Sequence, residues 1–386
     1  MSNLDYSLRR RNRYLEPVIA PLTSRKMVFI GGPRQVGKTT LALSLLGKGA
    51  DETHPAYFNW DNPHAAGRLR RLELPPHEPL LVLDEVHKFA RWRNLVKGIY
   101  DTEKSRRRVV VTGSARLDFY RKGGDSLVNR YRYFRLHPFS LLEANSSPTK
   151  SDLEALLRFG GFPEPLFLQD EREHRIWQRD RVARVVRDDL RDLERVREIS
   201  LIEHLVDLLP HRVGSQLSLN SLREDLQVDH KTVERWITIL ENMYLCFRIA
   251  PFGTPKVRAV KKTQKLYLWD WSMAPEGGPR FENLMASQLL KYCHFIEDTE
   301  GHRMELRYLR DTDKREVDFV VLKDRKPMFA VECKTGAREV SPAIRYFAQR
   351  LAIPHYYQVH LADRHFQSGE VTVLPFRAFC RELALP

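Results

Sequence analysis

A glycine-rich segment near the N-terminus contains the residue types that most directly predict chemistry. Residues 32–39 read Gly-Pro-Arg-Gln-Val-Gly-Lys-Thr, which fits the P-loop pattern of Gly, four residues, Gly-Lys-Thr. In such a loop the glycines let backbone amides surround the phosphates of a nucleotide, and the next helix directs the positive end of its dipole at them. We expect Lys38 to reach the β- and γ-phosphates and the Thr39 hydroxyl to bind Mg²⁺. The predicted nucleotide contacts are Gly32, Pro33, Arg34, Gln35, Val36, Gly37, Lys38, Thr39 and Thr40.

An acidic pair follows the next strongly apolar run. Residues 80–83 are short and wholly apolar, as in a buried strand, and Asp84-Glu85 comes directly after them. A carboxylate at the tip of a neighbouring strand supplies the second protein ligand of a nucleotide-bound Mg²⁺, so we assign that role to Asp84. Glu85 is placed to orient and deprotonate an attacking water. The pair predicts hydrolysis of the nucleotide in addition to binding.

Strand and helix signals alternate through the first 145 residues. After the strand that leads into the glycine-rich loop, further strands are predicted at 57–60, 80–83, 109–112 and 133–136. This alternation predicts an α/β fold with a parallel sheet wrapped by helices, and a ligand at the carboxyl ends of the strands. Thr112 or Ser114, where the fourth strand ends, could sense the γ-phosphate, and either hydroxyl could instead cap the next helix.

The motifs occur together in a recognisable order. GGPRQVGKTTL, LLVLDE, VTGSAR, NRYRYFRLHPFSLLE and GGFPEPLF follow one another, and over nearly its whole length the chain resembles a group of archaeal and bacterial AAA-type ATPases. The resemblance implies an AAA-type sheet, ATP and Mg²⁺ as cofactors, a helical lid, and assembly into a homo-oligomer such as a ring. In such rings an arginine from the neighbouring subunit stabilises the transition state. Arg130 matches that arginine best and Arg116 second.

Four regions are expected from these patterns. The Asn/Ser/Pro-rich stretch 145–152 is typical of a linker, and a long charged helix is predicted over 174–198. Proteins of the group that the chain resembles carry a C-terminal domain of unknown function with a nuclease-like appearance. We expect an ATPase core at 1–150, a helical lid at 151–199, a winged-helix-like domain at 200–262 and a nuclease-like domain at 263–386.

The third region contains a candidate DNA-binding element. Residues 219–226 and 229–236 fit the two helices of a helix-turn-helix, with Asp229 as N-cap. His230, Lys231 and Arg235 would then lie near a helix N-terminus, where residues that read a DNA groove usually sit. A basic ridge, expected to contact phosphates, follows at Lys256, Arg258, Lys261, Lys262 and Lys265. A protein-docking module is the alternative.

The last region contains a second set of chemically suggestive residues. Residues 315–321 and 328–334 are predicted as adjacent strands, so that Glu332 and Lys334 face one way and Cys333 faces the core. Asp318 can meet Glu332 across the sheet. With Glu282 upstream, this arrangement resembles the PD-(D/E)XK nuclease core, which implies Mg²⁺ held by Glu282, Asp318 and Glu332.

In that arrangement Glu332 and Lys334 would polarise a water that attacks a phosphodiester bond. The usual proline before the aspartate is replaced by Val317. An ion cluster that only holds a sheet edge therefore remains the alternative.

Composition limits the class of protein. A chain of 386 residues accommodates two or three domains. No apolar run approaches 18 residues and no signal peptide is apparent, so no membrane span is predicted. Four scattered cysteines exclude a zinc or disulfide framework and suit a reducing cytoplasm, where we expect the protein. The net charge of +14 favours a polyanionic partner, nucleic acid first, although a generally basic surface would also account for it.

Three functional hypotheses are compatible with these features. The first is an ATP-driven enzyme that remodels, branch-migrates or cleaves DNA, including branched DNA. The second is an ATPase switch whose nuclease-like domain is inactive and serves recognition. The third is a defence or antitoxin-like scaffold in which ATP sets the oligomeric state. The intact set Lys38, Asp84 and Glu85 disfavours a purely structural role.

Overall fold

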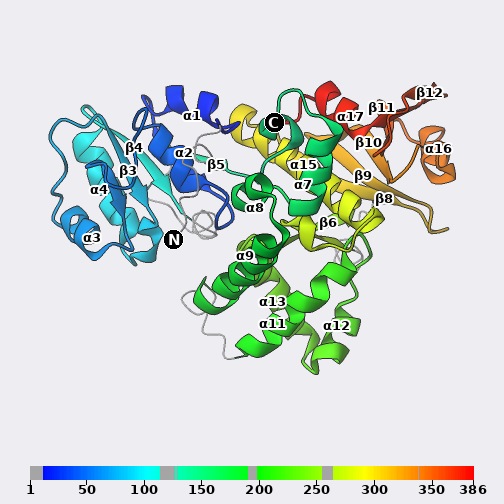
Figure 1. Ribbon diagram of the computed structural model, residues 1–386, viewed down its shortest axis with the longest axis horizontal. Helices are drawn as coiled ribbons and strands as arrows, with labels where there is room; N and C mark the ends of the chain where they lie inside the picture. The colour runs from blue at the N-terminus through cyan, green and yellow to red at the C-terminus, as the bar shows by residue number, and fades with distance from the viewer. Residues whose placement is uncertain (1–11, 114–126, 128, 190–197, 254–263, 338) are drawn as a thin grey trace. The chain divides into compact units, whose positions relative to one another are not determined.

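The computed structural model describes residues 12–113, 127, 129–189, 198–253, 264–337 and 339–386. The chain divides into two compact units, Met1–His137 and Pro138–Pro386, which are described separately below (Figure 1). Predictions that concern Ser114, Arg116, Lys256, Arg258, Lys261 and Lys262 fall outside the described residues.

Unit 1 contains a five-stranded sheet in which all neighbouring strands are parallel. The strand order is β2-β3-β4-β1-β5, which confirms the predicted parallel α/β core. The strands are β1 (Met27–Gly31), β2 (Tyr57–Asn59), β3 (Leu80–Asp84), β4 (Arg108–Thr112) and β5 (Tyr131–Arg135). The helices are α1 (Glu16–Leu22), α2 (Lys38–Ser44), α3 (Pro63–Arg70), η2 (Val86–Lys88) and α4 (Trp92–Glu103).

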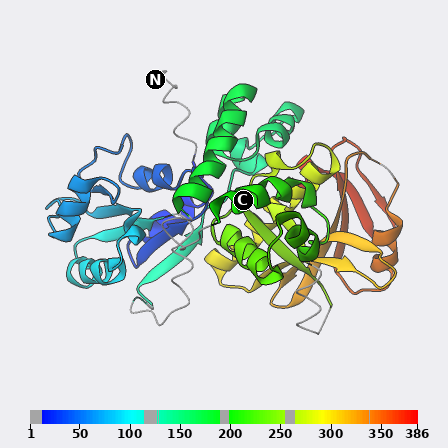
Figure 2. The ribbon, with the colours of Figure 1, turned by 90° about the horizontal axis from the view of Figure 1, so that it is seen from below.

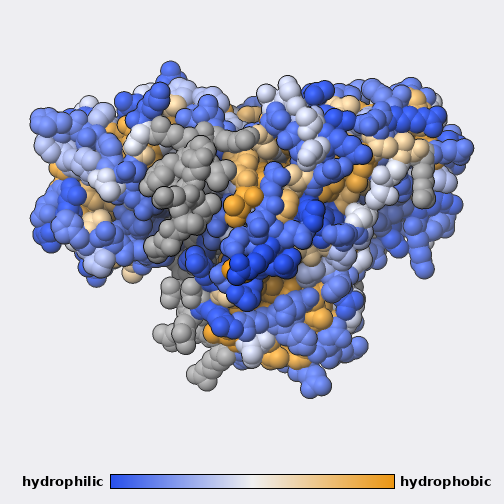
Figure 3. All heavy atoms as spheres, viewed as in Figure 1, coloured by the Kyte–Doolittle hydropathy of each residue, from blue (hydrophilic) through white to orange (hydrophobic). Residues whose placement is uncertain are grey.

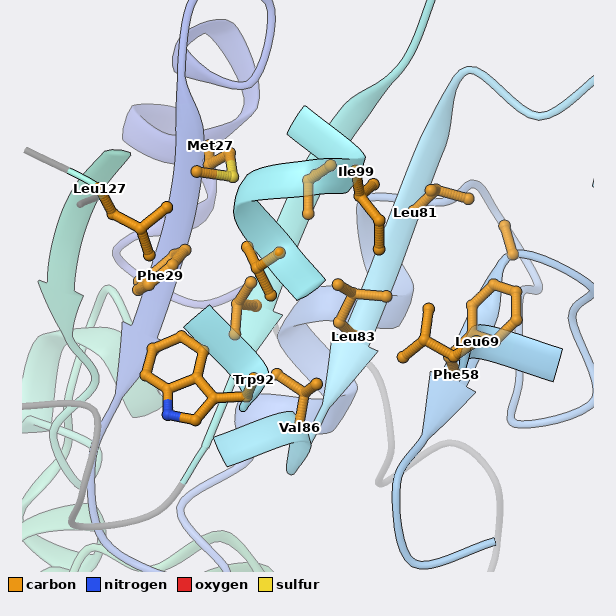
Figure 4. Close-up of a cluster of buried hydrophobic side chains, with 14 of the residues drawn as sticks. Met27, Phe29, Phe58, Leu69, Leu81, Leu83, Val86, Trp92, Ile99 and Leu127 are labelled. Atoms are coloured by element: carbon orange, nitrogen blue, oxygen red, sulfur yellow. The ribbon is translucent and has the colours of Figure 1, made fainter. Parts of the chain in front are cut away.

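One hydrophobic cluster holds α4 and η2 against this sheet (Figure 4). Phe29 of β1 and Leu83 of β3 contribute side chains from the sheet, and Trp92 and Ile99 contribute from α4. The strands β1 and β3 are buried along their whole length. Because helices cover a parallel sheet on both faces, such strands are continuously apolar instead of alternating. This packing fixes the carboxyl ends of β1, β3 and β4 next to one another.

The first half of unit 2 is helical. Its elements are α6 (Leu141–Ala144), α7 (Lys150–Phe159), α8 (Pro163–Leu168), α9 (Glu171–Ala183), η4 (Arg184–Asp189), α11 (Ile199–Leu208), η5 (Leu209–Arg212), α12 (Leu219–Leu226) and α13 (His230–Asn242). The stretch predicted as a linker already contains the start of α7, because Thr149 and Asp152 form a reciprocal capping box there.

The helix predicted over 174–198 is helical through Asp189, and its end at 190–197 lies outside the described residues. It is an α-helix only to Ala183, and a π-helical turn, η4, follows. Val185 and Val186 are both buried in this turn. In a regular α-helix two adjacent side chains point about 100° apart, and the wider π turn relaxes that constraint.

The second half of unit 2 contains an eight-stranded mixed sheet with the order β12-β13-β11-β10-β9-β8-β6-β7 (Figure 2). Its strands are β6 (Cys246–Pro251), β7 (Lys265–Leu268), β8 (Met304–Arg310), β9 (Glu316–Lys323), β10 (Lys326–Lys334), β11 (His355–His360), β12 (Phe366–Ser368) and β13 (Val371–Pro375). Its helices are η6 (Trp271–Met273), α15 (Gly278–Glu300), α16 (Pro342–Ala348) and α17 (Phe376–Glu382).

Strands β9 and β10 form the hairpin that the sequence predicts. They pair antiparallel, and the two residues between them, Asp324 and Arg325, both have positive φ, at 51° and 69°. Two positive φ angles are the requirement of the type I′ turn, whose twist matches that of a hairpin. This register places Asp318 and Glu332, two residues of the carboxylate cluster described below, opposite each other.

The face drawn in Figure 3 is mostly hydrophilic, in keeping with the 30% of charged residues. None of the helices that the structure describes has the length and apolar character needed to cross a membrane. The four cysteines are free thiols, as their spacing predicts.

Candidate nucleotide site and carboxylate cluster

The loop between β1 and α2 has a tightly curled backbone. Gly32 and Gly37 have φ of 149° and 96°, and Gln35, although not a glycine, has φ of 60°. A Cβ at Gly32 would lie 2.4 Å from the carbonyl oxygen of Leu136, so only glycine fits there. Three positive-φ residues within six positions curl the loop, and such turns can direct backbone amides toward one side, as in an anion-binding concavity. The loop also leads directly into the N-terminus of α2, as the P-loop pattern predicts.

Lys38 lies across this loop. Its side chain is buried, and Nζ donates to the carbonyl oxygens of Gly32 at 3.0 Å and Pro33 at 2.7 Å. The ammonium is thus held over the concavity by the backbone that would surround the phosphates. This is the position from which a P-loop lysine contacts β- and γ-phosphate oxygens.

Asp84, at the end of β3, is held by three hydroxyl groups. Thr39 Oγ1 and Tyr57 OH donate to its Oδ2, each at 2.8 Å, and Thr112 Oγ1 donates to Oδ1. The Thr39 hydroxyl and the Asp84 carboxylate come from adjacent elements and supply the hard oxygen ligands that Mg²⁺ prefers. These residues fit a nucleotide-bound Mg²⁺ because that ion takes one or two protein oxygens and completes its shell with phosphate and water.

Tyr57 is a member of the site that the sequence analysis missed. It reaches Asp84 because β2 and β3 pair in parallel, which aligns Tyr57 with Val82. Burial raises the pKa of the Tyr57 phenol, and the Asp84 carboxylate adds to that shift. The phenol therefore stays protonated and donates to Asp84 at neutral pH.

Thr112 lies between the two strands that carry the loop and the acidic pair. It pairs with Ile30 of β1 and with Asp84 of β3, and it is fully buried. This position next to Asp84 suits a residue that responds to the γ-phosphate.

The backbone of Glu85 has a left-handed conformation that is rare for a residue other than glycine. Its φ is 54°, and its amide donates to the Thr112 carbonyl at 3.0 Å. Burial raises the pKa of its carboxyl group, Lys38 opposes the shift and Asp84 adds to it. One carboxylate oxygen is buried and has no hydrogen-bond partner among the described residues. That oxygen lies 3.6 Å from His87 Nε2 and 3.8 Å from Lys88 Nζ. A carboxylate with raised proton affinity is suited to accept a proton from water.

A second feature missed by the sequence analysis is a clip made by Arg13 and Tyr14. The Arg13 guanidinium donates to the carbonyl oxygens of Val36 and His137, both at 2.5 Å. Tyr14 OH donates to the Arg135 carbonyl at 2.6 Å and accepts from the His137 amide at 3.2 Å. The clip therefore ties the glycine-rich loop to the segment that follows β5.

We predict that Arg13→Ala weakens ATP binding about tenfold, a loss of about 1.4 kcal/mol, because the loop loses its buried anchor. Arg13→Lys should recover part of the loss, since an ammonium reaches one carbonyl but not both. Titration of a fluorescent ATP analogue measures this. Arg25→Ala, an exposed arginine of the same unit, is the control and should bind normally. Equal affinities for Arg13→Ala and the control would show that the clip does not support the loop.

Arg130 lies at the opposite edge of the sheet from the glycine-rich loop. Its carbonyl accepts from the amide of Met27, the first residue of β1, and its Nε donates to Asp101 at 3.1 Å. The loop begins at the other end of β1, roughly 15 Å away at about 3.3 Å per residue. Arg130 therefore lies away from the glycine-rich loop of its own chain, and its action on a neighbouring subunit stays a prediction.

In unit 2, the residues predicted to contact DNA on a helix lie at the start of α13. His230, Lys231 and Arg235 are exposed, while Val233 and Trp236 on the opposite side of the helix are buried. Asp229 occupies the N-cap position but makes no capping hydrogen bond with its side chain.

The prediction that Lys265 belongs to an exposed basic ridge is wrong. Lys265 is only 1% exposed. It lies on β7, which is buried along its whole length because α15, η5 and η6 contact it. Its ammonium lies instead among carboxylates.

We define the carboxylate cluster as Glu282 of α15, Glu316 and Asp318 of β9, and Glu332 of β10. Val331 pairs with Phe319, so Glu332 and Asp318, the next pair along these antiparallel strands, face the same side of the sheet. Asp318 Oδ2 accepts from the Cys333 amide at 2.8 Å, and Lys334 Nζ donates to Glu332 Oε1 at 2.6 Å. The structure therefore brings the predicted residues together.

The side chain of Cys333 differs from its prediction. It is partly exposed, whereas Glu332 beside it is only 5% exposed. Adjacent residues of a strand face opposite sides, and both sides of β10 are covered, because Ala330 and Val331 are each fully buried. Glu332 shares the side of Ala330, and Cys333 shares the side of Val331.

Burial dominates the electrostatics of the cluster. It raises the pKa of Glu332 to about 8 and that of Glu282 to about 7, with Asp318 adding to both shifts and lysines opposing them. The pKa of Asp318 is also raised, by burial first. No group of three or more His, Cys, Asp and Glu side chains within the described parts of the chain is arranged to hold a metal ion.

These shifts predict a pH dependence of local stability. Glu282 and Glu332 lose protons near 4.5 when unfolded but near 7 and 8 when folded. Between these values the folded state binds more protons, so stability falls as pH rises from about 5 to about 8. Hydrogen exchange of β9 and β10, corrected for intrinsic rates, should show protection declining across this window, and Glu332→Gln should flatten the decline. Protection that rises over the same window would contradict the assignment.

Comparison with known proteins agrees with the geometry of unit 1. Residues 24–145 match the sequence family described as an AAA domain. Residues 150–276 and 277–379 match two domains of unknown function, DUF8612 and DUF4143. The matched residues 24–145 include the P-loop, Asp84 and Glu85, so the comparison and the geometry both indicate a P-loop nucleotide-binding domain similar to AAA domains.

The similar full-length proteins are uncharacterized. One from Mycobacterium tuberculosis is 24% identical over 246 residues, 63% of this chain and 54% of the relative. The chain thus spans about half the length of the mycobacterial relatives. One from Methanocaldococcus jannaschii is 22% identical over 414 residues, covering 92% of this chain and 84% of the relative.

Two solved structures share low similarity with the chain. The ORC1 protein of Aeropyrum pernix in complex with DNA matches 70% of this chain and 90% of its own, with 16% identity and a TM-score of 0.33. The RuvB Holliday junction branch migration motor of Thermotoga maritima matches 66% of this chain and 97% of its own, with 18% identity and a TM-score of 0.32.

Proposed function

We propose that this chain is an ATP-hydrolysing AAA-type protein that binds DNA and remodels it, with unit 1 as the motor and unit 2 as the DNA-binding part. The observation that carries the proposal is the arrangement around Asp84. Thr39, Thr112 and Tyr57 all donate to its carboxylate, which brings the loop, the acidic pair and the sensor position into one hydrogen-bonded set. A set of this kind couples the presence of a γ-phosphate to the position of Glu85.

Each residue has a separate task in the hydrolysis. Lys38 would bind the β- and γ-phosphates, and Thr39 and Asp84 would hold Mg²⁺, which would offset charge on the phosphate oxygens. Glu85 orients the attacking water and accepts its proton. Thr112, fixed between the two strands, positions Asp84. Arg130 would be supplied to the site of a neighbouring subunit, which supports the proposal that the protein works as a homo-oligomer.

The DNA-binding part of the proposal is supported by charge and exposure. The chain has a net charge of +14, and three basic or titratable side chains lie exposed on the first turns of α13. Helices α12 and α13 contact each other, and Gln227 between them has a left-handed backbone with φ of 53°. This is the geometry of two helices joined by a tight turn, and the second helix can enter a DNA groove.

We predict that Lys231→Glu with Arg235→Glu weakens binding to duplex, single-stranded and four-way DNA alike, by about tenfold or more at moderate salt, because phosphate contacts dominate affinity. Fluorescence anisotropy across a salt series measures this, and the salt dependence of the double variant should be shallower. Lys150→Glu with Arg158→Glu on α7, both exposed side chains, makes the same charge change and is the control. A flat salt dependence in the wild type would refute DNA binding through this surface.

A second candidate function is an ATPase switch in which the C-terminal part of unit 2 serves recognition without cleaving nucleic acid. The order α15-β8-β9-β10-α16-β11 supports the proposal of a nuclease-like core. The carboxylate cluster in that core, however, contains a buried lysine, and this observation favours an inactive version. The switch function would be rejected if the wild type degraded labelled DNA in the presence of Mg²⁺ and if Glu332→Ala abolished that degradation but retained ATP hydrolysis.

A further inference from the structure

The carboxylate cluster of unit 2 has a lysine between its members. Lys265 Nζ lies 2.5 Å from Glu316 Oε1, 3.3 Å from Glu282 Oε1 and 3.9 Å from Asp318 Oδ1. These carboxylates come from α15 and β9, and the ammonium arrives from a third element, β7. The Lys265 side chain is 2% exposed. A single cation thus bridges the acidic groups at the point where a bridging metal ion would otherwise lie.

The surroundings hold this arrangement in place. Tyr267 OH donates to Glu282 Oε1 at 2.7 Å, and the Tyr308 ring lies 5.4 Å from Lys265 Nζ. Gly214 covers Glu282 from the other side, since a Cβ there would approach both carboxylate oxygens to about 3 Å. Glu282 therefore has an aromatic hydroxyl, an ammonium and backbone packed against it, which leaves little room for a hydrated ion.

Two of the carboxylates have cationic partners other than Lys265. Arg310 Nη1 lies 2.6 Å from Glu316 Oε2, and Lys334 Nζ lies 2.6 Å from Glu332 Oε1. A divalent cation placed within about 4 Å of a buried ammonium would meet strong repulsion, because charge interactions are weakly screened in the interior. Metal binding would require the Lys265 ammonium to leave the cluster. Lys265 would then be a buried charge without a carboxylate partner, which is costly.

We infer that Lys265, and not a metal ion, is the cation of the carboxylate cluster, so that the cluster takes no divalent cation in the wild-type protein. A fixed ammonium supplies the positive charge but cannot deliver a metal-bound water, and this part of unit 2 then has no metal-dependent phosphodiester chemistry. The inference goes beyond the proposed function and does not depend on DNA binding or on ATP hydrolysis.

The experiment counts bound Mn²⁺ by electron paramagnetic resonance in the nucleotide-free full-length chain. The proteins compared are the wild type, Asp318→Asn, Lys265→Met and the Lys265→Met/Asp318→Asn double variant. Any ion bound in unit 1 contributes equally to all four, because none of the changes touches that unit. We expect the wild type and Asp318→Asn to bind the same number of ions, Lys265→Met to bind one more, and the double variant to lose it again.

Lys291→Met is the matched control. Lys291 is an equally buried lysine of unit 2 that lies outside the carboxylate cluster and pairs with Glu143 at 2.5 Å, so its loss should create no ion site in the cluster. A folded Lys265→Met protein without an additional ion would overturn the inference. Loss of one Mn²⁺ on Asp318→Asn in the wild-type background would overturn it as well, and that comparison stands even where Lys265→Met fails to fold.

Discussion

Replacement of Glu85 by glutamine should leave ATP binding nearly unchanged and slow hydrolysis by about 10²- to 10⁴-fold, the usual contribution of a positioned general base. Glutamine has nearly the same size and keeps the backbone conformation, but it cannot accept a proton from water. The pKa of the partly buried Glu85 carboxyl is raised, chiefly by burial, which favours proton acceptance by this group. Single-turnover hydrolysis and equilibrium binding of ATP, measured in parallel, separate the two effects.

Lys38→Ala is the matched comparison for that experiment. It removes the ammonium that lies over the loop, so binding itself should be lost and hydrolysis with it. If both variants lost ATP affinity equally, Glu85 would have a role in binding and the assignment of the general base would be wrong.

Arg130→Ala should slow ATP hydrolysis by about 10³-fold or more relative to the wild type, without weakening ATP binding. This is the effect expected for an arginine that acts on the nucleotide of a neighbouring subunit. The reason is geometric, because Arg130 lies beside the start of β1 and the loop lies beyond its end. Steady-state ATP hydrolysis at saturating ATP measures the effect. Arg132→Ala, which removes an exposed arginine of the neighbouring strand β5, is the control and should be active.

Mixing two inactive proteins tests the same residue more sharply. Arg130→Ala subunits keep an intact Glu85, and Glu85→Gln subunits keep an intact Arg130. In a mixed oligomer some interfaces combine the two intact residues, so activity should return to a sizeable fraction of wild type. A mixture that stays as inactive as its components would exclude action of Arg130 across a subunit interface.

How far the sequence predicts this molecule depends on how local the interactions are. The P-loop and the Asp84-Glu85 pair are read from contiguous residues, and the parallel sheet follows from the alternation of strands and helices. Tyr57 and Arg13 could not be found in this way. Tyr57 meets Asp84 across 27 residues, and Arg13 meets the His137 carbonyl across 124, so their roles exist only once the sheet has formed.

For Lys265, local sequence led to a wrong prediction. Basic neighbours in sequence predicted an exposed ridge, because charge patterning reports composition and not burial. In the structure β7 is covered by helices, and its lysine is stabilised by carboxylates from α15 and β9. The hairpin of β9 and β10 was predicted well, since its register is set by a two-residue turn. The partner on β7 depends on the packing of distant elements.

The central claim is that ATP hydrolysis in unit 1 is coupled to DNA held by unit 2. The most direct test is the steady-state rate of ATP hydrolysis by the full-length protein with and without duplex, single-stranded and four-way DNA. We expect at least one of these DNAs to raise the rate several-fold, and Lys231→Glu with Arg235→Glu to remove the stimulation but keep the basal rate. Coupling would be contradicted if no DNA changed the rate and if the wild type and the double variant were indistinguishable. The basal rate must still be abolished by Glu85→Gln, which shows that it comes from unit 1.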